Sequence, residues 1–113
     1  MLQIYHNSRC SKSRECLAIL ENSDAEYQVI NYLKELPSAT QLKELIKKLN
    51  IKPIDMIRRN ETIWKENFAN KMLDDEQLIE AMVAYPILIE RPIVVNGNKA
   101  VIARPPSRAL EII

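Results

Sequence analysis

Cys10 stands in a stretch of the chain whose charges favour a nucleophilic sulfur. Arg9 precedes it directly, and Lys12 and Arg14 follow shortly after it. Positive charges near a thiol stabilise the thiolate and lower the pKa of the sulfur, and the same charges attract anions. The stretch therefore predicts a thiolate that reacts with an oxyanion. The residues alone leave open the alternative that Cys10 is a small buried apolar side chain.

The elements predicted on either side of Cys10 place it where a strand gives way to a helix. Residues 2–5 alternate in polarity like a strand, and residues 16–20 carry apolar side chains at helical spacing. Unpaired backbone N–H groups and the positive end of the helix dipole meet at such a helix start, where they stabilise a thiolate or a bound anion. We expect Ser11 or Ser13 to supply a capping hydroxyl there.

The composition restricts the classes of protein to which the chain can belong. Its 113 residues are 47% hydrophobic and 27% charged, which suits one globular domain and excludes a disordered chain. A formal net charge of +1 provides no general basic excess, so we expect no nucleic-acid partner. No apolar run approaches membrane-spanning length, and no signal-peptide pattern opens the chain, so we expect a cytoplasmic protein without a membrane partner.

The cysteine and histidine content argues against a metal centre. The chain has 2 cysteines and 1 histidine, too few for a structural zinc site or a disulfide framework. We therefore expect no bound metal or cofactor. Cys16 falls on the apolar side of the first predicted helix, so we interpret it as a core residue rather than a redox partner of Cys10.

The middle of the chain predicts a small α/β sheet with a helical insertion. A second strand is expected within residues 26–33, and the order strand, helix, strand indicates parallel pairing. Ser38 and Gln41 have the spacing of a capping box, and broken helical patterns continue from there. The helical insertion is thus expected at about 38–85. Its core residues are expected to include Trp64, Met72 and Met82.

The last part of the chain predicts a hairpin followed by a helix. Asn96 and Gly97 lie between two apolar runs, which predicts a tight type I′ turn with these two residues at its centre. Two prolines at 105–106 are typical of a helix start, and we expect that helix to bury Leu110 and Ile113 on one face.

Four separate motifs resemble those of one known family. They lie at residues 5–14, 57–60, 86–95 and 104–105. The two most specific are the pattern Cys-x-x-Ser-Arg after the first strand and Glu-Arg-Pro-Ile-Val-Val before the hairpin. Together they resemble the glutaredoxin-coupled arsenate reductases of the ArsC type, from end to end of the chain. The resemblance implies a single domain over 1–113, with a thioredoxin-like mixed sheet flanked by helices and the insertion between its second and third strands.

The same resemblance implies an arsenate site around a catalytic cysteine. Cys10 would be the nucleophile, and the arsenate oxyanion would be held by Arg58, Arg91 and Arg104. Guanidinium groups suit this task because they form paired hydrogen bonds to oxyanions. His6 matches the family histidine that helps the cysteine to ionise, and Ser13 and Arg14 are supporting residues of the same motif. The bond between Arg91 and Pro92 is expected to be cis.

The implied reaction begins with attack of the Cys10 thiolate on arsenic, which displaces water or hydroxide and leaves a thiol-arsenate adduct. Glutathione, a co-substrate rather than a bound cofactor, would then attack the adduct, and glutaredoxin would resolve the resulting mixed disulfide. Ser13 stands where a Cys-x-x-Cys pattern would have its second cysteine. The resolving thiol must therefore come from another molecule.

Two other classes of protein share the implied fold. A regulatory binding protein of the Spx type commonly carries a Cys-x-x-Cys switch, which Ser13 excludes here. A glutaredoxin-like thiol transferase would leave the three arginines unexplained. The residues also leave open that the family site acts on a substrate other than arsenate.

Overall fold

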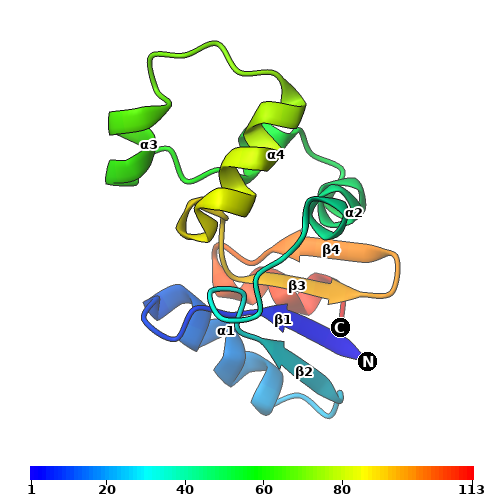
Figure 1. Cartoon of the computed structure of the whole chain (residues 1–113). Coiled ribbons are helices and arrows are strands. Elements are labelled where there is room, and N and C mark those ends of the chain that lie inside the picture. The colour runs from blue at the N-terminus through cyan, green and yellow to red at the C-terminus, as the bar shows by residue number, and fades with distance from the viewer. The chain divides into compact units, whose positions relative to one another are not determined.

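The computed structural model describes every residue from Met1 to Ile113. Its chain divides into two units (Figure 1). The sheet unit consists of Met1–Glu35 and Arg91–Ile113, and the helical unit consists of Leu36–Glu90. The helices of the predicted insertion all belong to the helical unit.

The sheet unit is built on four short strands. They are β1 (Leu2–Tyr5), β2 (Tyr27–Ile30), β3 (Ile93–Asn96) and β4 (Lys99–Ile102). The strand order is β2-β1-β3-β4, with β1 parallel to β2 and the other neighbours antiparallel. The predicted mixed α/β sheet is therefore confirmed. β1 is central, so the loop that leaves its carboxyl end is anchored by strands on both sides.

Helix α1 (Ser11–Glu21) and the 3-10 helix η3 (Pro106–Glu111) cover one face of this sheet (Figure 1). Their common core with the strands contains Leu2, Ile4, Cys16, Leu20, Val94, Val101, Ala103 and Ala109. Cys16 is 0% exposed, which confirms its assignment to the core. The expected face of the last helix is wrong, because Leu110 is 61% and Ile113 43% exposed. A 3-10 helix has three residues per turn, so Pro106 and Ala109 share the buried face instead.

The hairpin forms, but its turn differs from the predicted one. Asn96 pairs with Lys99, so Gly97 and Asn98 are the two central residues. Gly97 has a φ of +61°, whereas Asn98 has no positive φ. A positive φ at the first central position alone is typical of a type II′ turn. The turn therefore lies one residue later in the chain than the sequence pattern indicated.

The helical unit contains α2 (Ala39–Leu49), η1 (Pro53–Met56), α3 (Thr62–Asn67), α4 (Asp75–Ala84) and η2 (Pro86–Leu88). The capping box predicted at Ser38 and Gln41 is confirmed, since each side chain accepts a hydrogen bond from the backbone N–H of the other. Asp74 and Gln77 form the same arrangement at the start of α4. No helix of the protein is both long and apolar enough to cross a membrane.

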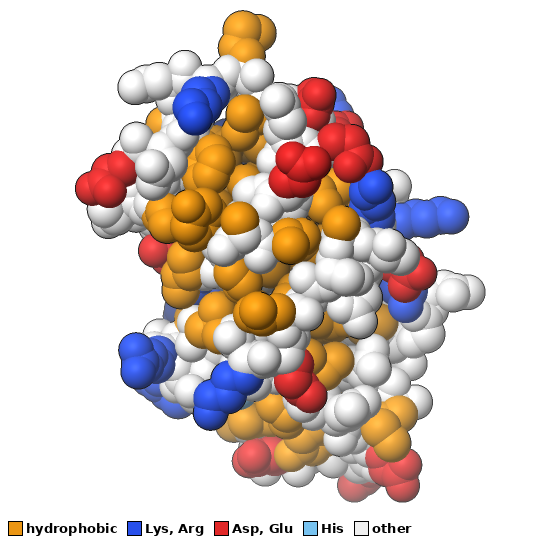
Figure 2. Space-filling model, viewed as in Figure 1, with side chains coloured by type: hydrophobic (Ala, Val, Ile, Leu, Met, Phe, Trp, Pro, Cys, Tyr) orange, Lys and Arg blue, Asp and Glu red, His pale blue; other side chains and the backbone are white.

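The apolar interior of the helical unit includes two of the three residues expected there. Met82 is 0% and Trp64 8% exposed, and the Trp64 ring stacks on Phe68 with 5.6 Å between centroids. Met72 is 101% exposed, so its predicted core position is wrong. It lies in the loop between α3 and α4, where no helical periodicity directs a side chain inward. Hydrophobic side chains also gather on the surface of this unit that Figure 2 shows.

Candidate active site

Cys10 is the residue that joins the loop after β1 to helix α1. It occupies the N-cap position of the helix in an extended conformation, with φ −94° and ψ 121°. Its carbonyl oxygen accepts the first hydrogen bond of the helix, from the N–H of Arg14 at 3.0 Å. The sulfur therefore lies at the positive end of the helix dipole, as the sequence predicted.

No side-chain hydrogen bond caps this end of α1, so the capping role expected for Ser11 or Ser13 is wrong. The Ser13 hydroxyl is buried and accepts a hydrogen bond from the backbone N–H of Asn7 at 3.0 Å. It also lies 2.5 Å from Nδ1 of His6. Because the residue at the cap is a cysteine, the first-turn N–H groups are left to stabilise its thiolate.

Asn7 organises the loop, although the sequence analysis assigned it no role. It is 4% exposed, and its carbonyl oxygen accepts from the N–H of Cys10 at 3.0 Å. Its side-chain oxygen accepts from the N–H of Arg9, also at 3.0 Å. Asparagine side chains commonly accept a hydrogen bond from the backbone N–H two residues later in a turn, so the role of Asn7 could have been predicted from its residue type. Asn7 thus fixes the position of the nucleophile relative to Ser13.

The pKa of Cys10 lies below its ordinary value. Burial of the thiol raises the pKa, but it is outweighed by the N–H of Ser13, the hydrogen bond and charge of the Arg91 side chain, and the N–H of Lys12. The lowering of the Cys10 pKa agrees with the sequence prediction. The charged side chain that causes it differs from the predicted ones. The cation that stabilises the thiolate is Arg91, which is distant in the sequence, rather than the side chains of Arg9, Lys12 or Arg14.

His6 and Arg14 both contact residues of the loop that carries Cys10. Burial and the charge of Arg14 lower the pKa of His6, so the ring is neutral at neutral pH. Its exposed fraction is 7%, and no histidine surface is visible on the face that Figure 2 shows. Arg14 donates from Nη1 to the carbonyl oxygen of Ser8 at 2.9 Å. The neutral His6 ring can therefore accept from the Ser13 hydroxyl, which in turn holds Asn7.

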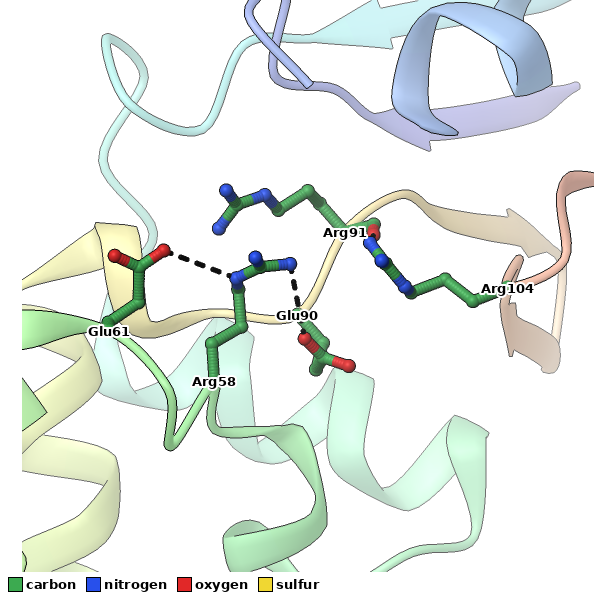
Figure 3. A network of polar contacts seen from close by, with 5 residues as sticks. All are labelled: Arg58, Glu61, Glu90, Arg91 and Arg104. Carbon is green, nitrogen blue, oxygen red and sulfur yellow. Dashed lines mark hydrogen bonds and ion pairs between the residues drawn. The ribbon is translucent and has the colours of Figure 1, made fainter. Parts of the chain in front are cut away.

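Arg91 and Arg104 are linked within the sheet unit. Arg91 is 8% exposed and precedes Pro92 through the expected cis peptide bond. Arg104 donates from Nη1 to the carbonyl oxygen of Arg91 at 3.0 Å (Figure 3). The bond between Arg104 and Pro105 is also cis, which the sequence analysis did not anticipate. The structure thus connects two of the three predicted arginines to one another, and Arg91 to the sulfur.

Arg58 belongs to the helical unit, where it has two acidic partners (Figure 3). Its Nε donates to Oε1 of Glu61 at 3.3 Å, and its Nη1 lies 3.6 Å from Oε1 of Glu90. Neither glutamate has a role that was predicted from the sequence. Available signals were the spacing of Glu61, three residues after Arg58, and the place of Glu90 in the Glu-Arg-Pro motif.

The side chains of the protein form no cluster of metal ligands. No group of three or more histidine, cysteine, aspartate or glutamate residues lies close enough together to hold one. Cys10 and Cys16 are both free thiols. The chemistry that this arrangement can perform is therefore nucleophilic attack by a stabilised thiolate beside donors suited to an anion.

Known proteins match almost the whole chain in sequence. Residues 5–112 match the ArsC family. The uncharacterized protein YfgD of Escherichia coli (strain K12) is 46% identical over 114 residues, which cover 99% of this chain and 96% of that protein. An arsenate reductase of Haemophilus influenzae is 44% identical over 112 residues, which cover 97% of each protein.

A solved structure gives the same result in three dimensions. The arsenate reductase from Vibrio cholerae superposes with a TM-score of 0.94 at 46% identity, covering 99% of this chain and 97% of that one. The matched residues include the loop of Cys10 and the segments that carry Arg58, Arg91 and Arg104. On its sequence and its fold, the protein belongs to the ArsC family.

Proposed function

We propose that this protein is an arsenate reductase that uses Cys10 as its nucleophile. Its relatives in Haemophilus influenzae and Vibrio cholerae carry that name. The observation that carries the proposal is the setting of Cys10, because the Arg91 guanidinium and the N–H groups of Ser13 and Lys12 all favour its thiolate. The same donors suit an oxyanion that approaches the sulfur.

The first step of the proposed reaction forms a bond between the Cys10 sulfur and arsenic. The thiolate supplies the electron pair, and one arsenic–oxygen bond breaks to release hydroxide, or water after protonation. Arsenic remains As(V) in this adduct. Arg58, Arg91 and Arg104 are proposed to hold the remaining oxygens, where paired hydrogen bonds stabilise the negative charge.

The second step of the proposed reaction reduces arsenic. The glutathione thiolate attacks the Cys10 sulfur, the sulfur–arsenic bond breaks, and its electron pair stays on arsenic, which becomes As(III). A mixed disulfide between Cys10 and glutathione remains, and a glutaredoxin thiol attacks its glutathione sulfur, which forms a glutaredoxin–glutathione disulfide and releases the Cys10 thiolate. Over the cycle, one glutathione thiol and one glutaredoxin thiol are oxidised, and together they supply the two electrons that reduce As(V) to As(III).

The need for an external thiol is supported by the state of Cys16. This second cysteine is 0% exposed, and burial raises the pKa of its thiol to about 11. A protonated, inaccessible thiol cannot resolve an adduct on Cys10. Ser13, which occupies the other position from which a thiol could do so, instead holds His6 and Asn7. Glutathione and glutaredoxin are thus the proposed reductants, and the reducing cytoplasm is the proposed location.

Arsenite production by the purified protein tests this proposal. We expect turnover only when arsenate, glutathione and glutaredoxin are all present. Cys10→Ser should abolish it, whereas Cys16→Ser should retain it, since that thiol takes no part. Arsenite formation by Cys10→Ser would disprove the mechanism. Turnover of a glutathione mixed disulfide without any arsenate reduction would instead support a thiol transferase.

A further inference from the structure

The Arg58 side chain has its donors divided between two carboxylates. A guanidinium can grip an oxyanion with two prongs along either of two edges, Nε with Nη2 or Nη1 with Nη2. In this protein Nε faces Glu61 and Nη1 faces Glu90 (Figure 3). Each two-pronged edge therefore has one nitrogen directed at a glutamate. Nη2 alone faces neither glutamate, so an oxyanion that binds along either edge meets a carboxylate at the second nitrogen of that edge.

The backbone fixes both glutamates beside Arg58. The N–H of Glu61 donates to the Arg58 carbonyl at 3.2 Å. On the other side, Ile57 and Ile89 form an antiparallel bridge, in which the N–H of Arg58 donates to the carbonyl of Leu88 at 2.7 Å. Arg58 and Glu90 follow the two buried bridge isoleucines and so share the opposite face of the bridge. Their meeting is thus built into the register of the bridge.

The two carboxylates hold Arg58 with different strength. Glu61 accepts a hydrogen bond from Nε at 3.3 Å. The contact between Nη1 and Glu90 is 3.6 Å long, which is an ion pair beyond hydrogen-bond distance. Both glutamate side chains are about one-quarter exposed, at 25% and 24%, so water can solvate a carboxylate that moves away. Glu90 is the partner that an incoming anion can replace at the lower cost.

We propose that Glu90 is a positioning residue that occupies the end of the Arg58 guanidinium until an oxyanion takes its place. This rests on the proposed function, in which Arg58 is one of the groups that hold arsenate. The Glu90 carboxylate beside the Arg58 guanidinium disfavours weakly bound anions at that end of the side chain. An oxyanion that forms paired hydrogen bonds replaces Glu90, whereas Glu61 keeps the guanidinium aligned. Glu90 therefore sets the affinity of the site for anions and its discrimination among them.

Glu90→Gln tests this role because it removes the charge and keeps the shape. We expect the KM for arsenate to fall about two- to fivefold, with a smaller change in kcat. The inhibition constants of inorganic phosphate and sulfate should fall as well. Glu61→Gln should instead raise the KM for arsenate. The matched control is Glu76→Gln, which makes the same charge change at an exposed ion pair with Lys43 in the same unit and should leave these constants unaltered.

A double-mutant cycle with Arg58→Ala establishes whether Glu90 acts through Arg58. In that background Glu90→Gln should have no effect on the KM. An unchanged or raised KM in Glu90→Gln, or an equal effect with and without Arg58, would overturn the inference. Glu90→Asp retracts the carboxylate and keeps its charge, and it should also lower the KM for arsenate. It replaces Glu90→Gln in this test if that variant folds poorly.

A second readout separates this inference from the proposed function. Inorganic phosphate should protect Cys10 from alkylation, and in Glu90→Gln half-protection should need about two- to fivefold less phosphate. This measurement requires no arsenate turnover. Arsenate reduction without any shift in protection would refute the role of Glu90 alone. An Arg58-dependent shift in a protein that reduces no arsenate would support the role of Glu90 and refute the proposed reaction.

Discussion

Arg91 in the sheet unit and Arg58 in the helical unit both come from family motifs but have opposite surroundings. Arg91 is 8% exposed, and its charge and hydrogen bond favour the Cys10 thiolate. The Arg58 side chain is 16% exposed and faces the carboxylates of Glu61 and Glu90. A guanidinium is a permanent cation, so its neighbours decide what it does. Arg91 thus favours the thiolate of the nucleophile, whereas Arg58 is the arginine that we propose to bind the anion.

The two regions also differ in how they position their charges. Around Cys10 the contacts are made largely by backbone N–H groups and a buried hydroxyl, which have no freedom to leave once α1 has formed. Around Arg58 the partners are flexible carboxylates with access to water. Substitutions in the first region should therefore alter the reactivity of the sulfur, and those in the second should alter the affinity for anions.

The largest effect expected from this comparison is that of arginine-to-lysine substitution. Arg91→Lys should lower kcat/KM for arsenate about ten- to a hundredfold, because lysine cannot reproduce charged two-pronged hydrogen bonds worth about 1.5 to 3 kcal/mol. It should also slow disulfide exchange between Cys10 and a glutathione mixed disulfide. Arg58→Lys should impair arsenate reduction alone. Assays of both reactions on both variants test this, and equal loss of disulfide exchange in the two would remove the distinction.

The pH dependence of alkylation should show the same division more finely. The pKa of Cys10 is lowered, so its alkylation midpoint should lie at a lower pH than in the urea-unfolded protein. Arg91→Ala should raise the midpoint, since a group that favours the thiolate is lost, and Arg58→Ala should leave it unchanged. Cys16, with a pKa raised to about 11, provides the internal reference and should stay unlabelled near neutral pH. An alkylation midpoint that stays unchanged in Arg91→Ala would show that the helix start alone lowers the pKa of Cys10.

Features set by local physics could be predicted from the sequence. The capping box at Ser38 depends on residues three apart, and the buried position of Cys16 follows from helical periodicity. The placement of Cys10 at a helix start needed only the strand and helix patterns beside it. The family motifs named Arg58, Arg91 and Arg104, and the role of these arginines in binding an oxyanion stays a prediction.

Features set by pairing between distant segments could not be predicted. The partnership of Arg91 with Cys10 depends on where β3 begins beside β1, and that of Arg58 with Glu90 depends on the register of one bridge. Periodicity also misplaced Met72, because it assumes a helix where the chain forms a loop. At the hairpin, the sequence pattern predicted a turn but placed Asn96 at its first central position, which Gly97 occupies instead.

The smallest expected effect concerns that turn, which lies in the sheet unit away from the chemistry. Gly97 has a φ of +61°, but a Cβ added there would meet nothing within 4 Å. Gly97→Val should therefore destabilise the protein through backbone strain alone, by about 1 to 3 kcal/mol in urea unfolding. The matched control is Asn98→Val, whose backbone has no positive φ and which should cost less.

Cys10 should keep its alkylation midpoint in both hairpin variants, because neither turn residue contributes to the lowered pKa of that thiol. Equal destabilisation by the two valines would contradict the type II′ assignment. A shifted midpoint in Gly97→Val would have a different meaning. Since β3 begins directly after Arg91 and Pro92, it would show that strain in the hairpin reaches the arginine that prepares the nucleophile.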